Sequence, residues 1–248
     1  MMNIFTETTM TSPHGYEIPM LSAADADTKE ILLCLHGFAG SKRSSVIAAV
    51  AEALKGDGIG VVTFDWPAHG ESSAPGAALT VENCLEDLTA VYASLRAHGL
   101  PVSCFATSFG GYLATLWRHE HPSAFRKLIL RSPALKMNEV FDRILTDEEK
   151  TALLNGGTIT VERGRPMTLD RAFSDGLARH DAFSPSAPSP DSILILQGDR
   201  DEVVLPQDTA AYAEKNGICI EWFRGSDHYY KRDGDRDRIA QTARAFLL

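Results

Sequence analysis

The chain has 248 residues, which fits one α/β domain with room for a small insertion. Its apolar content of 44% is ordinary for a globular protein that builds a core of normal size. The formal net charge of −9 argues against nucleic-acid binding, which needs a basic surface, and against attraction to an anionic membrane.

The N-terminal segment MMNIFTETTMTSPHG lacks the charged stretch followed by an apolar stretch that marks a secretory signal. No apolar run approaches the ~20 residues that span a bilayer. None of the four cysteines forms a CxxC pair, and Cys34 and Cys104 lie inside apolar runs, where cysteine behaves as a small hydrophobe. We therefore expect reduced thiols in a cytoplasmic protein.

Short apolar runs alternate with helix-like stretches along most of the chain. Runs of this kind are typical of strands buried on both faces of a parallel sheet. Their alternation with helices predicts right-handed βαβ units and a doubly wound, mostly parallel sheet. The first 20 residues are less regular and fit one or two antiparallel edge strands. The predicted strands are residues 31–35, 59–64, 102–106, 128–130, 193–196 and 218–223. The predicted helices are residues 44–55, 81–98, 109–119, 207–215 and 236–246.

Residues 133–190 break this rhythm. We interpret them as a small cap inserted into an α/β core that is made of residues 1–132 and 191–248. Loops at strand ends commonly carry specificity, so a cap at this place would help to choose the substrate. The alternative is a surface excursion with no role in binding.

Two local signals give the cap some internal structure. Thr146 followed by Glu149 has the spacing of a capping box, and the helix that it opens should end near residues 155–157, where Asn-Gly-Gly is a stop signal. Residues 158–161 and 166–169 flank a polar turn and predict a hairpin.

Ser108 stands where a predicted strand meets a predicted helix, in the sequence ATSFGG at residues 106–111. A sharp turn of this kind exposes a serine hydroxyl and needs small residues two positions away on each side. The sequence resembles the G-x-S-x-G nucleophile elbow of α/β-hydrolases, with Ala106 in place of the first glycine. The alternative is a serine that only caps the helix starting at Phe109.

The resemblance to α/β-hydrolases extends to His36-Gly37-Phe38, which follows the strand at residues 31–35. In that family such a turn supplies one backbone donor of the oxyanion hole. The resemblance therefore assigns the oxyanion hole to the backbone N–H groups of Phe38 and Phe109, and losing one such donor typically costs about 10²–10³ in rate. We interpret His36 itself as a structural residue that braces the loop.

The segment DWPAHGES, residues 65–72, follows the next predicted strand and resembles the family turn D-x-x-G-H-G-x-S. Pro67-Ala68 replaces the usual Arg-Gly. Asp65 and His69 are polar groups at the end of a strand where ligands bind in open α/β sheets, which makes them candidates for catalysis. We favour a structural role for both, in a hydrogen-bonded loop packed beside Ser108.

The acid of the site is expected in the loop after the strand at residues 193–196. Gly198 and Asp201 fit the family pattern G-x-x-D-x-x-V, so Asp201 is the expected acid that orients a histidine and fixes its tautomer. Asp199 and Glu202 compete for this role from the same loop.

The base is expected to be His228, in the loop after the last predicted strand. Of the eight histidines it alone follows the acid in chain order. The resulting order of serine, aspartate and histidine is the order of α/β-hydrolases.

Taken together, these features resemble a serine hydrolase of the α/β-hydrolase superfamily, in particular the small bacterial cinnamoyl and feruloyl esterases and, more loosely, monoacylglycerol lipases. The resemblance implies a small-molecule ester substrate, a catalytic triad of Ser108, Asp201 and His228, and no metal or organic cofactor. Asn138 and Asp142, with Phe141 between them, are the cap residues expected at the substrate.

Three alternatives stay open at this point. A thioesterase and a serine aminopeptidase share the fold and the same groups, and a binding module without catalysis can retain the fold alone. The acyl group, the alcohol and the oligomeric state are not determined by these motifs.

Overall fold

The computed structural model describes residues 4–162 and 164–248, and the elements of the core lie where the sequence predicts them, with ends that agree within two residues. The strands of the main sheet are β1 (Thr6–Thr11), β2 (Glu17–Ala23), β3 (Glu30–Leu35), β4 (Ile59–Phe64), β5 (Val102–Thr107), β6 (Leu128–Arg131), β9 (Ile193–Gly198) and β10 (Cys219–Phe223). The helices of the core are α1 (Ser45–Ala53), α2 (Val81–Arg96), α3 (Phe109–Glu120), α7 (Pro206–Asn216) and α8 (Asp235–Leu247). Short 3₁₀ turns occur at η1 (Gly76–Ala78) and η2 (Pro190–Ser192).

Within the described residues, the main sheet has eight strands in the order β1-β2-β4-β3-β5-β6-β9-β10. β2 pairs antiparallel with both β1 and β4, and the remaining neighbours pair in parallel. The mostly parallel, doubly wound sheet and its antiparallel edge strands from the N-terminal segment are therefore confirmed.

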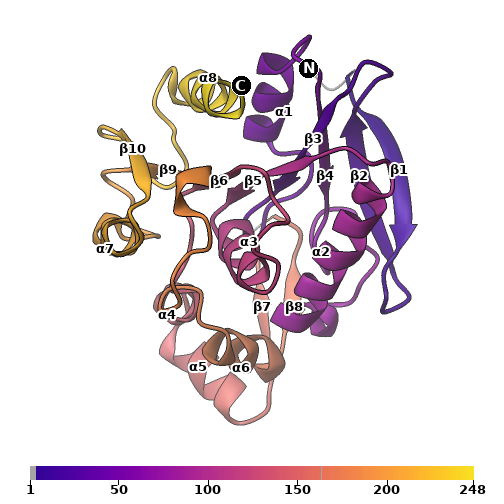
Figure 1. Cartoon of the computed structure of the whole chain (residues 1–248). Helices are drawn as coiled ribbons and strands as arrows, with labels where there is room; N and C mark the ends of the chain where they lie inside the picture. Colours follow the sequence, from indigo (N-terminus) through magenta and orange to yellow (C-terminus); the bar gives the residue numbers. More distant parts are fainter. Residues whose placement is uncertain (1–3, 163) are drawn as a thin grey trace.

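The two faces of the sheet bury two separate apolar cores, which is why its central strands are apolar at successive positions. Leu32 and Cys34 of β3 pack with α1 and α8, whereas Leu33 and Leu35 face α2 and α3. Figure 1 shows α1 and α8 together on one side of the sheet and α2 and α3 on the other. The four cysteines all lie in the described part of the chain and are free thiols.

The parallel register places the carboxyl ends of four strands at one edge of the sheet. Thr107, Arg131 and Leu196 are register partners across β5, β6 and β9, and Gly198 lies opposite Phe223 of β10. The loops that follow β5, β9 and β10 carry the serine, the acid and the base expected from the sequence. All three loops therefore leave the sheet at the edge where open α/β sheets bind ligands.

The segment between β6 and β9 contains α4 (Met137–Ile144), α5 (Asp147–Leu154), the antiparallel pair β7 (Ile159–Val161) and β8 (Met167–Leu169), and α6 (Arg171–Arg179). The capping box is confirmed, because Thr146 Oγ1 accepts from the Glu149 amide and Glu149 Oε2 accepts from the Thr146 amide. The hairpin is confirmed as well, although Arg163 in its turn lies outside the described residues. Helices α4 and α6 were not predicted. Figure 1 shows α4, α5 and α6 grouped away from α1 and α8.

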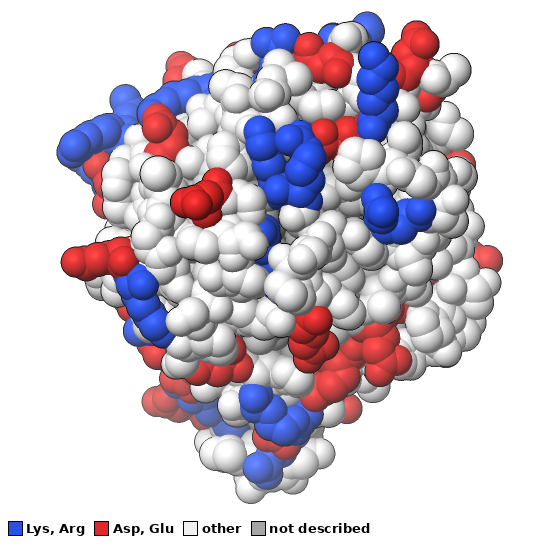
Figure 2. Space-filling view, in the orientation of Figure 1, with Lys and Arg blue, Asp and Glu red and all other residues white. Residues whose placement is uncertain are grey.

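The surface mixes both signs of charge. Lysine and arginine side chains alternate with aspartate and glutamate over the face shown in Figure 2. Of the helices in the described part of the chain, none is long and apolar enough to cross a membrane.

Candidate active site

Ser108 occupies a strained turn between β5 and α3. Its backbone angles, φ 51° and ψ −113°, lie outside the regions that residues with a side chain ordinarily adopt. Packing around the turn is close: a Cβ on Gly37 would lie 3.2 Å from Cβ of Ser108, and a Cβ on Gly110 would lie 2.6 Å from the carbonyl oxygen of His36. Ala106 is fully buried in β5, so the core accommodates the methyl group that departs from the family pattern. Small residues thus allow the loop after β3 to lie against the serine.

The hydroxyl of Ser108 is not committed to another protein group. Within the described residues, its Oγ forms no hydrogen bond, and the residue exposes 9% of its surface. His228 also exposes 9%. Both residues are therefore largely covered by the protein and keep a small part of their surface open to solvent. No group of three or more His, Cys, Asp or Glu side chains in residues 4–162 and 164–248 is arranged to hold a metal ion.

The residues predicted to form the oxyanion hole come from two chain segments that meet at Ser108. Phe109 begins α3, and Phe38 lies in the loop after β3, with the two rings 6.0 Å apart. Backbone N–H groups in the first turn of a helix lack partners within the helix, and the helix dipole makes this end positive. Donors at such a place can stabilise negative charge that develops on a substrate oxygen.

Asp201 and His228 form a buried pair at the same edge. Nδ1 of His228 donates to Oδ2 of Asp201 at 2.8 Å, and Oδ1 of Asp201 accepts from the amides of Val203 and Val204 at 2.9 and 2.8 Å. Burial acts to raise the pKa of Asp201, but the hydrogen bond and charge of His228 and the amide of Val204 hold it below its usual value. The ionised carboxylate therefore fixes the ring with a proton on Nδ1 and leaves Nε2 free to accept another.

The loop after β9 contains three acidic residues, and their hydrogen bonds and exposure distinguish their roles. Oδ1 of Asp199 accepts from the amide of Gly225 at 2.5 Å, so this side chain holds the end of β10. Glu202 is exposed. Asp201 is the one of the three that contacts His228.

Gly198 explains why the acid loop and the histidine loop can meet. A Cβ on this residue would lie 2.4 Å from the carbonyl oxygen of Ser226, a distance that real Cβ atoms do not reach. The amide of Arg200 donates to the same carbonyl at 3.1 Å. A glycine here lets the two backbones hydrogen-bond directly and sets the distance between Asp201 and His228.

The sequence reasoning missed the residues that lie beneath this pair. Ser132 has a positive φ of 42°, and its Oγ lies 3.1 Å from Oη of Tyr230. A hydrogen bond from Ser132 also helps to lower the pKa of Asp201. Nη2 of Arg131 donates to the carbonyl oxygen of His228 at 3.4 Å. Arg131 and His228 are 97 residues apart in the chain, and Ser132 and Tyr230 are 98 apart, so no local sequence motif predicts these contacts.

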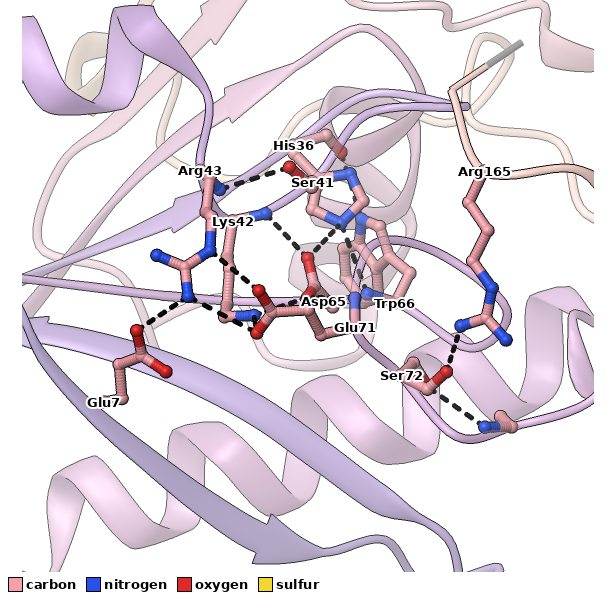
Figure 3. Close-up of polar contacts among 11 residues, drawn as sticks. Glu7, His36, Ser41, Lys42, Arg43, Asp65, Trp66, Glu71, Ser72 and Arg165 are labelled. Atoms are coloured by element: carbon pink, nitrogen blue, oxygen red, sulfur yellow. Dashed lines mark hydrogen bonds and ion pairs between the residues drawn. The ribbon is translucent and has the colours of Figure 1, made fainter. Parts of the chain in front are cut away.

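Asp65 lies at the centre of a structural network, shown in Figure 3. Its Oδ1 accepts from the amide of Lys42 at 2.7 Å, and its Oδ2 accepts from Nζ of Lys42 at 2.8 Å and from the amide of Glu71 at 2.9 Å. Nζ of Lys42 also donates to Glu71 at 2.6 Å. A Cβ on Gly70 would meet this carboxylate at 2.3 Å. The carboxylate thus connects the loop after β3 to the loop after β4, which agrees with the structural role expected for Asp65.

His36 and His69 are neutral braces in this region. Nδ1 of His36 donates to the carbonyl of Gly37 at 2.8 Å, and its Nε2 accepts from the amide of Trp66 at 3.3 Å. Burial lowers the pKa of His36. Nδ1 of His69 donates to the carbonyl of Pro67, and burial together with the nearby His36 lowers the pKa of His69 to about 3. Both rings fix loop backbone beside Phe38.

Lys42 offers a test of this network. We expect Lys42→Met to lower the free energy of unfolding by about 3–5 kcal/mol, because Asp65 would stay buried without a cation. The neighbouring Arg43 pairs with Glu71 and Glu7 at the surface, so Arg43→Met is expected to cost less than about 1 kcal/mol. Urea unfolding measures both variants. Equal losses in the two would contradict a special role for the buried pair.

The three residues predicted at the substrate lie on α4 but do not point the same way. Phe141 is buried, and its ring lies 6.1 Å from that of Phe38 in the loop after β3. Asn138 and Asp142 lie on the exposed face of α4, where Asp142 pairs with Lys150 at 2.9 Å. The amphipathic helix thus turns its apolar stripe inward and its polar face to solvent, and a contact of Asn138 and Asp142 with the substrate stays a prediction.

Solved structures share this fold over nearly the whole chain. A structure from Agrobacterium vitis S4 named as a hydrolase has a TM-score of 0.84 at 21% identity and covers 98% of this chain and 99% of its own. Est1E from Butyrivibrio proteoclasticus, with ferulic acid bound, has a TM-score of 0.79 at 19% identity and covers 97% of each chain. Alpha/beta hydrolase domain-containing protein 10 from mouse has a TM-score of 0.78 at 18% identity and covers 98% of each chain. At these identities the likeness shows the fold alone.

Comparisons of the sequence identify the family to which the chain belongs. A protein of Bacillus subtilis (strain 168) named as a 2-succinyl-6-hydroxy-2,4-cyclohexadiene-1-carboxylate synthase is 31% identical over 128 residues, which are 50% of this chain and 44% of that protein. The chain thus spans less than half the length of this curated relative. The family model described as serine aminopeptidase, S33, matches residues 26–157, more than half of the chain. The chain therefore belongs to the serine aminopeptidase S33 family of the α/β-hydrolase superfamily.

Proposed function

We propose that this hydrolase cleaves carboxylic esters through an acyl-enzyme formed on Ser108. The observation that carries the proposal is a strained, uncommitted serine at the same sheet edge as the buried Asp201–His228 pair. A serine is a weak nucleophile by itself and becomes effective when an oriented histidine removes its proton. The loop after β5 supplies the serine, and the loops after β9 and β10 supply the histidine and the acid that orients it.

In the proposed reaction, Oγ of Ser108 attacks the ester carbonyl while Nε2 of His228 takes its proton. The negative oxygen of the tetrahedral intermediate accepts hydrogen bonds from the amides of Phe38 and Phe109. Asp201 stabilises the imidazolium without taking its proton. The imidazolium then protonates the leaving alcohol. Water attacks the acyl-enzyme with His228 again as base, and the carboxylic acid leaves.

The surroundings of Ser108 favour an aromatic acyl group. Phe38 stacks on Phe173 of α6 at 5.7 Å, and Phe109 lies 5.9 Å from the same ring. Phe141 of α4 completes the cluster at 5.1 Å from Phe173. Aromatic rings attract other rings beyond the gain from area alone. The ferulic acid seen in Est1E lends further support to hydroxycinnamoyl esters as the preferred substrates.

A substrate screen tests the proposed function. It would measure kcat/KM on chromogenic esters that differ in acyl length and aromaticity, with matched thioesters and aminoacyl amides. We expect esters to react best, and hydroxycinnamoyl esters to exceed long-chain acyl esters. The aminoacyl amides matter because the family is described as serine aminopeptidase. If amides or thioesters exceed the matched esters, the ester proposal is wrong.

Phe141 should contribute to acyl choice. We expect Phe141→Ala to lower kcat/KM on the hydroxycinnamoyl ester about tenfold relative to a straight-chain ester, because a buried ring that faces Phe38 is removed. Glu139→Ala is the matched control on the exposed face of α4 and should leave the ratio unchanged. The ratio of the two rates, measured for each variant, cancels any loss of active protein. An unchanged ratio in Phe141→Ala would show that Phe141 does not contribute to the choice of acyl group.

A further inference from the structure

Tyr229, which directly follows His228, carries an aromatic ring that the fold leaves open to solvent. It exposes 54% of its surface, whereas the other phenylalanine, tyrosine and tryptophan side chains of the described residues are buried or half-buried. Its ring centre lies 5.4 Å from that of His228, and the two rings are nearly perpendicular. An exposed ring therefore lies beside the proposed base, and the reaction described above does not use it.

The loop after β10 holds this ring in place. Oδ1 of Asp227 accepts from the amides of Tyr229 and Lys231 at 3.1 and 3.3 Å. Tyr230 has a positive φ of 52° and turns its side chain inward, where its Oη donates to the carbonyl oxygen of Leu196 at 3.0 Å. Nζ of Lys231 lies 4.9 Å from the centre of the Tyr229 ring. Because the loop is anchored on both sides of Tyr229, its ring is already ordered and loses little entropy when a partner binds to it.

The proposed reaction places the alcohol part of the ester on the side of His228. The imidazolium must protonate the oxygen of the leaving alcohol, so this oxygen has to lie within hydrogen-bond reach of Nε2. The proposed acyl group lies elsewhere, among the rings of Phe38, Phe141 and Phe173. Figure 1 shows α4 and α6, which carry two of these rings, well apart from β10 and α8, which flank Tyr229 in the chain. The alcohol is therefore the part of the substrate that can reach Tyr229.

A cavity of about 410 Å³ beside Tyr229 gives such a group room. Tyr229 and Lys231 line it on one side, and residues 44–46 line it where α1 begins. Carboxylates meet the positive charges of its wall: Lys231 pairs with Asp227 at 3.6 Å, and the buried guanidinium of Arg131 also has carboxylates nearby. With its charges balanced in this way, the cavity attracts neither ion strongly and suits a neutral group.

Given the ester hydrolysis proposed above, on which this step rests, we propose that Tyr229 forms the subsite for the alcohol part of the ester and that this alcohol carries a neutral aromatic ring. Aromatic rings attract one another, in stacked or edge-to-face pairs, beyond the gain from buried area alone. The substrate is then an ester with a ring on each side of the bond that breaks. The acyl ring lies in the buried phenylalanine cluster, and the alcohol ring lies against Tyr229 at the surface.

The methyl and benzyl esters of one acid, the acid that the substrate screen ranks first, test this subsite. The two esters form the same acyl-enzyme, and their alcohols are of similar basicity, so their kcat/KM values differ through contacts of the alcohol. We expect the wild type to prefer the benzyl ester. Tyr229→Ala should lower the benzyl-to-methyl ratio about fivefold, the size of one aromatic pair. Tyr229→Phe keeps the ring and should keep the ratio. Circular dichroism establishes that both variants are folded.

The step that is slowed distinguishes a subsite from a disturbed histidine. The alcohol has left before water attacks, so the loss in Tyr229→Ala should fall on formation of the acyl-enzyme and not on its hydrolysis, and single-turnover kinetics separate the two steps. An unchanged ratio in Tyr229→Ala, or an equal loss in hydrolysis of the acyl-enzyme, would overturn the subsite and leave ester hydrolysis standing. A wild type that cleaves neither ester would instead contradict the proposed function, and the subsite with it.

Discussion

Ser108→Ala is expected to lower kcat for ester hydrolysis by about six orders of magnitude, to the residual rate that binding and the oxyanion hole sustain. The reason is that the variant lacks the hydroxyl that we propose as the nucleophile. Oγ of Ser108 is uncommitted within the described residues, at the edge where the Asp201–His228 pair lies. Loss of the nucleophile leaves the histidine with no partner to activate. Steady-state kinetics on the best ester of the screen measure the change.

Two controls accompany this variant. Ser94→Ala changes an exposed serine of α2 that bonds only to its own helix, and it should retain full activity. A fluorophosphonate probe should label the wild type and Ser94→Ala on Ser108, and should fail to label Ser108→Ala. Circular dichroism establishes that each variant is folded. A folded Ser108→Ala protein with near-normal turnover would refute the proposed nucleophile.

Asp201→Asn is expected to lower kcat by about four orders of magnitude, the size of the effect when a triad histidine is held in the wrong tautomer. Oδ1 of Asp201 accepts from the amides of Val203 and Val204, so the oxygen of an asparagine must stay on that side. Its amide nitrogen would then face Nδ1 of His228 and donate to it. The ring proton would move to Nε2, which could no longer accept the proton of Ser108.

The matched control is Asp199→Asn, two residues away in the same loop. Oδ1 of Asp199 accepts from the amide of Gly225, and an asparagine oxygen can keep that bond. We expect kcat to change less than about tenfold. Kinetics on both variants, with fluorophosphonate labelling as a measure of nucleophile activation, decide the assignment. If Asp199→Asn is the more damaging change, Asp199 and not Asp201 supports the histidine.

The segment between β6 and β9 shows where the sequence was sufficient to predict the structure and where it was not. The capping box at Thr146 and the hairpin followed from local signals, because both depend on contacts within a few residues. Helices α4 and α6 were missed although α4 spaces Met137, Val140 and Phe141 along one stripe. The helix is only eight residues long, and its stability comes from packing on α6 and on Phe38 in the loop after β3. Short helices of this kind depend on tertiary contacts more than on propensity.

The sequence by itself determined the α/β order, the strands and helices of the core, the turn at Ser108 and the loops that carry Asp201 and His228. These follow from apolar runs, glycines and spacing, which act locally. Only the tertiary structure decided that Asp201, and not Asp199, contacts His228, that Asn138 and Asp142 face solvent, and that Arg131 reaches the carbonyl of His228. Each of these depends on groups that are far apart in the chain or on the face that a helix presents, and the sequence pattern constrains such contacts only through the completed fold.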